Sequence, residues 1–149
     1  MPPPVNQIHR TMKEVIVKIE KQEELSRFLM LHGFDVEDLG NSVYRVSRPE
    51  ELPVFVKIDE KSLYFEIDLG NLHAFGPASL HFKLLDLNTE ILPVSFGINN
   101  TNPEDPRLVL VESREIGSLN DHEILSVFDA LELAVDRAEE LLTPAAGNA

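Results

Sequence analysis

The side chains that could carry out metal or acid–base chemistry are scattered along this sequence. Its five histidines stand at positions 9, 32, 73, 81 and 122, and none follows the H-E-x-x-H spacing of helical zinc sites. His122 stands between Asp121 and Glu123, where adjacent helical side chains diverge by about 100° and cannot converge on one ion. The absence of cysteine removes thiolate ligands, disulfides and cysteine nucleophiles. We therefore expect neither a metal centre nor a bound cofactor.

Residues 92–97, LPVSFG, come nearest to a serine nucleophile motif. A hydrolase nucleophile sits on a sharp strand-to-helix turn, usually within G-x-S-x-G. No glycine stands two residues before Ser95, and the expected helix precedes the segment while the expected strand follows it. We interpret the segment as a helix-to-strand junction, in which Pro93 ends the helix and the Ser95 hydroxyl satisfies a backbone group.

The apolar pattern predicts one α+β domain with about three helices packed on an antiparallel sheet. Alternating apolar residues mark the strands, and apolar residues at three- and four-residue steps mark the helices. Because the link 59–61 is too short for a crossover, the strands on either side of it must pair antiparallel. The expected order is therefore helix, three-strand meander, helix, two-strand hairpin, helix. The elements are a helix over 21–32 ended by Gly33, strands over 42–47, 53–58 and 62–69, a helix from Pro77 that carries Leu80, Leu84, Leu87 and Ile91, two strands flanking the NTNPEDP loop, and a helix from Ser118 or Asn120 to about Leu142.

The two ends of the chain are expected to lie outside this domain. Residues 1–10 include three consecutive prolines and predict a disordered arm, residues 11–143 form the single domain, and residues 144–149 form a frayed C-terminus. The segment 14–20, EVIVKIE, leaves two interpretations open: an additional N-terminal strand or a helical lead-in to the first helix.

The charge balance narrows the classes of partner. Acidic residues outnumber basic ones 26 to 13, and the formal net charge is −13. Such a charge repels nucleic acids and anionic lipid surfaces. No segment approaches the ~20 apolar residues of a membrane span, and the proline-rich start lacks the apolar run of a secretory signal. We therefore expect a cytoplasmic protein that neither binds nucleic acid nor inserts into a membrane.

The terminal helix is the most informative segment about protein partners. Leu133 lies about 160° around the helix from its apolar stripe, among acidic residues. This leucine is either an isolated exposed one or part of a contact with a partner, such as a second copy of the chain. The acids beside it either keep the helix hydrated or meet a basic segment of a partner. The candidate protein-interaction surface comprises Leu125, Leu133, Asp136 and Glu140, and the core-facing stripe comprises Ile124, Val127, Phe128, Leu131, Val135, Ala138 and Leu142.

Three stretches of the sequence resemble one bacterial family. They are VYRVSRPEELPVFVKIDEKSLYFEIDL, the junction LPVSFGI, and LVLVESREIGSLNDHEILSVFDALELAVDRAEELL. Together they resemble the YjfI-like family of unknown function over about residues 22–142. Two departures weaken any residue-level transfer: the NTNPEDP loop replaces the family's short aromatic hairpin, and ESREIGSLNDHEI follows its serine-rich stretch only loosely.

The order of elements is also similar to the YbjN and type III secretion chaperone fold, whose members are small, acidic and usually dimeric. This resemblance implies a non-enzymatic, partner-binding role and supplies no catalytic residues.

These observations support one leading hypothesis and two others. The leading one is a non-enzymatic, cytoplasmic, chaperone-like or regulatory module that binds a protein segment, as a homodimer. The alternative is an enzyme or small-ligand binder with a site assembled from separated residues such as His73, His81 and Tyr64. A third is a dedicated secretion chaperone, which requires an effector that the sequence does not name.

Overall fold

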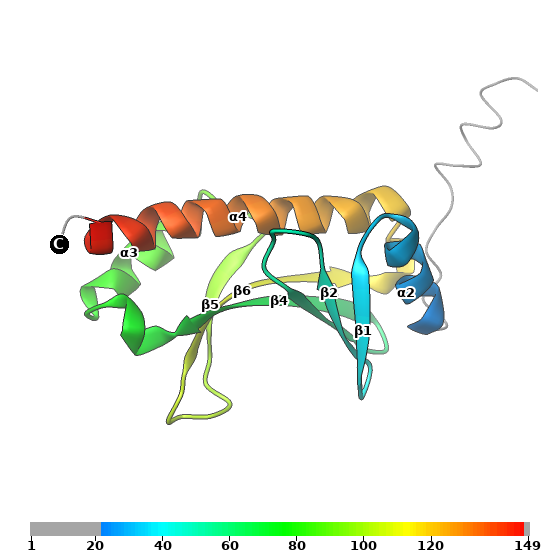
Figure 1. The fold of residues 1–149 in the computed structure, drawn as a ribbon, viewed down its shortest axis with the longest axis horizontal. Helices are drawn as coiled ribbons and strands as arrows, with labels where there is room; N and C mark the ends of the chain where they lie inside the picture. The colour runs from blue at the N-terminus through cyan, green and yellow to red at the C-terminus, as the bar shows by residue number, and fades with distance from the viewer. Residues whose placement is uncertain (1–21, 148–149) are drawn as a thin grey trace, which may run out of the picture.

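In the computed structural model, residues 22–147 are described, and they form a curved antiparallel sheet with its long helix on one side (Figure 1). The predicted α+β class and the order of its elements are confirmed. The elements are α2 (Gln22–Leu31), β1 (Asp35–Gly40), β2 (Val43–Ser47), β3 (Val54–Ile58), β4 (Ser62–Asn71), η1 (Leu72–Phe75), α3 (Ser79–Leu87), β5 (Ser95–Asn99), β6 (Arg107–Glu115), η2 (Ile116–Ser118) and α4 (Asp121–Gly147).

The six strands follow the order β1-β2-β3-β4-β6-β5, and every neighbouring pair is antiparallel. The predicted meander is β2-β3-β4, and the predicted hairpin is β5-β6, which joins it through the β4–β6 pair. The first strand, β1, was not predicted. Its residues are all exposed except the half-buried Val36. An edge strand rich in acids lacks the apolar alternation that marks a buried strand, so its sequence gives no strand signal. The possible strand over 14–20 and the arm over 1–10 lie outside the described residues.

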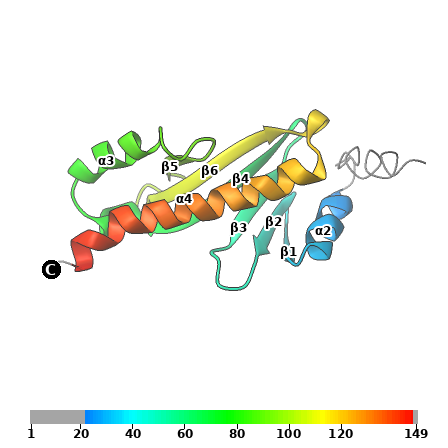
Figure 2. The same cartoon turned by 90° about the horizontal axis from the view of Figure 1, so that it is seen from above.

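Helix α4 covers the sheet along its length and provides most of the helical side of the core. Its 27 residues span about 40 Å, and Figure 2 shows the helix crossing the strands diagonally. The predicted stripe is confirmed, since Ile124, Val127 and Leu131 are fully buried against the sheet. The helix starts at the second of the two expected caps, where the backbone N–H of Glu123 donates to Oδ1 of Asn120 at 2.8 Å. It ends at Gly147, beyond the expected end near Leu142.

The end of α2 is also as expected. Gly33 has φ +88°, and the backbone N–H of Phe34 donates to the carbonyl of Leu29 at 3.1 Å. This is the left-handed turn that a glycine permits after a helix. It directs Phe34 into the core, where its ring meets that of Phe128 at 4.7 Å between centroids.

Among the described residues, one carboxyl side chain is buried on the helix-covered side of the sheet. Glu112 on β6 is 4% exposed and faces the same side as Leu108 and Leu110. Its Oε1 accepts a hydrogen bond from Nε of Arg114 at 2.8 Å, whereas its Oε2 has no hydrogen-bond partner among the described residues. Burial raises the pKa of this carboxyl, and the Arg114 guanidinium only partly opposes the shift.

We expect Glu112→Gln to raise the free energy of unfolding at pH 7.5 by up to about 1 kcal/mol, because the fold disfavours the ionised form. A raised pKa means that protonation of Glu112 favours the folded state. The stability of the wild-type protein therefore approaches that of the variant as the pH falls through that raised pKa. The difference between their free energies of unfolding should be smaller at pH 4.5 than at pH 7.5. Urea unfolding at both pH values measures it. A clear loss of stability at pH 7.5 would mean that the Arg114 ion pair outweighs desolvation.

Candidate protein-binding surface

An apolar feature of the described surface lies where α3 meets the edge strand β5. Between them is an open hollow of about 280 Å³ with an almost entirely apolar lining. Three sides of the hollow come from α3, from the end of β4 running into η1, and from the β5–β6 hairpin. The lining residues are Leu72, His81, Leu84, Leu85, Phe96, Gly97, Ile98 and Leu108.

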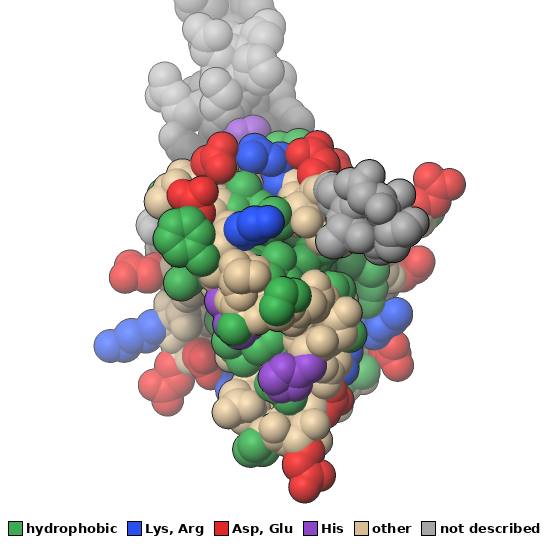
Figure 3. All heavy atoms as spheres, turned by 90° about the vertical axis from the view of Figure 1, so that its left-hand side faces the viewer, with side chains coloured by type: hydrophobic (Ala, Val, Ile, Leu, Met, Phe, Trp, Pro, Cys, Tyr) green, Lys and Arg blue, Asp and Glu red, His purple; other side chains and the backbone are tan. Residues whose placement is uncertain are grey.

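Large apolar side chains around this hollow project into solvent. Phe82 and Leu85 of α3 are 77% and 67% exposed, and Leu92 and Ile98 are 68% and 55% exposed. Figure 3 shows this end of the molecule. Hydrophobic side chains and histidines lie on it, and acidic side chains lie around them. A cluster of large exposed apolar residues on one face is typical of a contact surface with another protein. We call these four residues together with the hollow the α3 surface.

The α3 surface exists because α3 is apolar on two sides. Leu84 and Leu87 are buried and Leu80 packs on the core, as the spacing predicted. Phe82 and Leu85 are three residues apart and share the outward side of the helix. Their exposure was not predicted, although the pattern indicates it, since a surface helix normally carries polar residues opposite its core stripe.

A single hydrogen bond fixes α3 relative to β5. The backbone N–H of Phe96 donates to Oδ1 of Asn88 at 2.6 Å, so the residue that follows α3 holds the start of β5. This role was predicted for Ser95, but that hydroxyl has no hydrogen bond within the described residues. Residues 92–97 do lead from a helix into a strand, since β5 begins within them, but α3 already ends at Leu87, so Pro93 does not end the helix as predicted and Ile91 lies outside it.

Charged side chains fix the opposite end of the β5–β6 hairpin. Nε of Arg107 lies 3.1 Å from Oδ1 and Oδ2 of Asp68, and its Nη1 lies 3.0 Å from Oδ1 of Asp105. Oδ1 of Asp105 also accepts a hydrogen bond from Nδ2 of Asn71 at 2.6 Å. The Asn71 hydrogen bond, followed by Arg107, lowers the pKa of Asp105. This network ties the hairpin loop to the end of β4 and gives the hollow a rigid wall.

The candidate surface predicted on α4 consists of residues in different environments. Leu133 is 67% exposed, and Asp136 and Glu140 are exposed on the outer side of the helix. Oε2 of Glu140 lies 3.7 Å from Nε of Arg137, which also approaches Glu90 in the loop after α3. Leu125 is half-buried and packs against the core. The outer side of α4 therefore presents one exposed leucine among acids.

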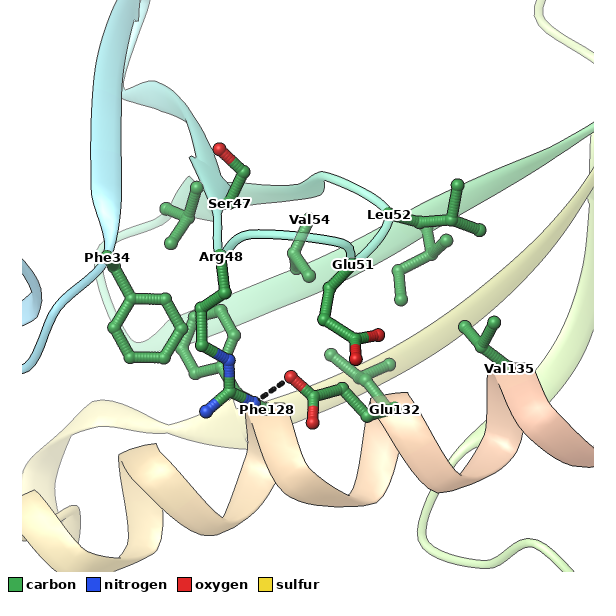
Figure 4. Close-up of a pocket in the computed structure, with 12 residues that line it drawn as sticks. Phe34, Ser47, Arg48, Glu51, Leu52, Val54, Phe128, Glu132 and Val135 are labelled. Carbon is green, nitrogen blue, oxygen red and sulfur yellow. Dashed lines mark ion pairs between the residues drawn. The ribbon is translucent and has the colours of Figure 1, made fainter.

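A second feature of α4 is its connection to the β2–β3 loop (Figure 4). The Arg48 guanidinium forms ion pairs with Glu132 and Asp129 and stacks over the ring of Phe34 at 4.7 Å from the centroid. Burial raises the pKa of Glu132, and Arg48 opposes that shift. The cavity beneath these side chains is about 10 Å³, which is the lower limit for one water molecule. This arrangement joins two segments of the fold and leaves no room for a ligand.

The structure does not bring His73, His81 and Tyr64 together. His81 lines the hollow, His73 is exposed on η1, and Tyr64 lies on the sheet face away from α4. The Tyr64 hydroxyl donates to Oε1 of Glu66 at 2.9 Å, and burial together with this hydrogen bond raises the pKa of the phenol well above its usual range. A phenol held protonated in this way is a poor base.

The hydrogen bonds of Glu66 continue across the sheet face that lies away from α4. Nδ2 of Asn99 donates to Oε2 of Glu66 at 3.2 Å, which links β5 to β4 across the intervening strand β6. The register places Val109 of β6 beneath this bridge, and Val109 is only 2% exposed. Tyr64, Glu66 and Asn99 therefore have structural roles.

Two further observations concern the part of the chain that the structure describes. Over residues 22–147 no three His, Asp or Glu side chains are grouped so that they could hold a metal ion. Over the same residues no helix is long and apolar enough to cross a bilayer.

Comparison with known proteins identifies the fold. No protein-family model matches the chain, and no curated protein sequence matches it. Several solved structures are similar, and three of them are described here. A chain of the heterodimeric ExoU–SpcU complex from the type III secretion system of Pseudomonas aeruginosa has a TM-score of 0.64 at 20% identity, covering 80% of this chain and 98% of that one.

The other two structures agree with the first. YbjN from E. coli has a TM-score of 0.56 at 10% identity, covering 87% of this chain and 94% of that one. The Yersinia pestis type III secretion chaperone SycH, in complex with a fragment of YscM2, has a TM-score of 0.53 at 21% identity, covering 78% and 95%. The expected YbjN and secretion-chaperone fold is confirmed. At these identities the likeness establishes the fold alone, and the YjfI-like family stays a prediction.

We expect Asn88→Ala to lower the free energy of unfolding by about 1–2 kcal/mol, because the buried N–H of Phe96 loses its acceptor. The matched change Ser95→Ala, which removes no hydrogen bond within the described residues, should cost less than about 0.5 kcal/mol. Urea unfolding of the two variants under one condition measures the difference. A larger loss for Ser95→Ala than for Asn88→Ala would contradict this assignment.

Proposed function

We propose that this chain is a non-enzymatic, chaperone-like protein-binding module of the cytoplasm that works as a homodimer. The observation that carries the proposal is the α3 surface, where Phe82 and Leu85 project beside an apolar hollow. The fold shared with chains from the ExoU–SpcU and SycH–YscM2 complexes supports it, because those structures are protein–protein assemblies.

A second copy of the chain is the occupant that suits the α3 surface. The surface is self-complementary, since it carries both a projecting aromatic ring, Phe82, and a hollow of about 280 Å³. In a two-fold dimer the same patch contacts itself, so each copy can place its projecting side chains in the hollow of the other. Because each copy carries a net charge of −13, the contact must be apolar enough to overcome mutual repulsion.

The outer side of α4 suits a different partner. Two copies packed through this helix would bring Asp136 and Glu140 close to like charges, which is unfavourable. A segment with Lys or Arg residues around an apolar side chain could instead contact Leu133 and pair with those acids. We therefore assign the surface predicted from sequence, Leu125, Leu133, Asp136 and Glu140, to a basic segment of the bound protein, with Leu125 supporting it from beneath.

For the homodimer, we expect Leu85→Asp to convert a dimer into a monomer, because it places two charges in an apolar contact. The side chain is 67% exposed in the single chain, so the fold should be unaffected. Size-exclusion chromatography with light scattering at micromolar concentration measures the mass. Leu133→Asp is the matched control, since Leu133 is equally exposed at 67% and lies on α4, and it should remain dimeric. A monomeric wild-type protein would refute the homodimer.

For the partner surface, the probe is a synthetic peptide in which pairs of leucines alternate with pairs of lysines. We expect the double change Asp136→Asn and Glu140→Gln to weaken binding of this peptide by about three- to tenfold. The reason is that it removes two negative charges beside Leu133. Fluorescence anisotropy at 0.15 M salt measures the dissociation constant. The control is Asp59→Asn with Glu60→Gln in the β3–β4 turn, which removes the same charge at exposed positions away from α4. Equal losses for both pairs would show that only net charge matters.

A further inference from the structure

The α3 surface contains one ionisable side chain in its hollow. Of the eight residues that line the hollow, seven are apolar or glycine, and the eighth is His81. His81 is half-buried in the single chain, and its imidazole has no hydrogen bond or ion pair within the described residues. A partner seated on the α3 surface would enclose the ring among leucine, isoleucine and phenylalanine side chains.

We propose that self-association through the α3 surface is controlled by protons, and that proton uptake by His81 separates the two copies. The inference rests on the proposed homodimer and adds the regulation of that contact. A neutral imidazole fits an apolar interface at modest cost, whereas an imidazolium requires water or a carboxylate. Histidine side chains in water take up a proton near pH 6.5, so the change falls in a range that cells reach.

The charged groups around the hollow do not provide a counter-ion for an imidazolium. On α3 itself, Asp86 and Lys83 lie about 140° and 160° around the helix from His81. Their angular positions direct both side chains away from the hollow.

The elements packed against α3 do not provide a counter-ion either. On η1 the titratable residue is His73, which would repel a second cation. Arg107 of β6 is paired with Asp68 and Asp105, which fixes those two carboxylates at the far end of the hairpin. Glu90, in the loop after α3, is paired with Arg137. In a two-fold dimer His81 of the second copy can approach as well, which adds repulsion when both rings are charged.

The sign of the effect separates it from the general influence of pH on an acidic protein. Lowering the pH adds protons to both chains, makes their net charge of −13 less negative and so reduces the repulsion between them. That influence alone would tighten a dimer between pH 7.5 and 5.5. Protonation of His81 acts in the opposite direction, so a weaker dimer at lower pH is specific to the proposed mechanism.

The test is sedimentation velocity of the full chain at pH 7.5 and 5.5 in 0.15 M salt. An imidazole that an apolar contact accepts only in its neutral form weakens association about tenfold for each pH unit below the ordinary histidine pKa, so with one ring from each copy the dissociation constant should rise about ten- to hundredfold at pH 5.5. In His81→Gln the dissociation constant should not rise at pH 5.5. His73→Gln, a histidine exposed on η1 outside the hollow, should respond as the wild type does.

A second variant, His81→Leu, guards against an effect of glutamine on packing, and it should also form a dimer that does not weaken at pH 5.5. Circular dichroism at both pH values checks that each variant is folded. A wild-type dimer whose dissociation constant is the same at both pH values overturns the role of His81 and leaves the homodimer standing. A wild-type chain that is monomeric at both pH values overturns the homodimer and the proton control together.

Discussion

The packing of Phe128 between two aromatic rings holds the two layers of this fold together. Its ring lies 4.7 Å from that of Phe34, just before β1, and 5.7 Å from that of Phe65 on β4, in an edge-to-face arrangement. Arg48 then stacks on Phe34 and reaches back to α4 through Glu132. Because these contacts join segments far apart in the sequence, the position of α4 on the sheet depends on them.

The placement of α4 determines which surfaces are left for partners. The helix covers the centre of one sheet face, and α3 packs at the β5 edge, beside the C-terminal half of α4 (Figures 1 and 2). At that edge α3 has the core on one side and solvent on the other, yet it carries large apolar residues on both. The large apolar contact surface therefore lies at the β5 margin of the helical layer, beside the outer side of α4 with its single exposed leucine.

Features set by local periodicity could be predicted from the sequence. The stripe from Ile124 to Ala138 and the core residues of α3 follow directly from three- and four-residue spacing. The strand β1 could not be predicted, because its stability comes from pairing with β2, half of its residues are acidic and all but Val36 are exposed. The hydrogen bond from Phe96 to Asn88 depends on how the chain turns between α3 and β5, and the ion pair of Arg48 with Asp129 joins residues 81 positions apart. Neither leaves a periodic signal.

The bridge from Glu66 to Asn99 has a consequence for the face of the sheet that no helix covers. A two-layer fold of this kind exposes one whole side of its strands, and an apolar side there would attract other chains during folding and storage. Here a carboxylate, an amide and a phenol lie over β4, β6 and β5, above Val109, so the β5 end of that side presents polar groups. This part of the bare sheet therefore presents polar groups, and in that respect it differs from the apolar α3 surface at the same edge of the fold.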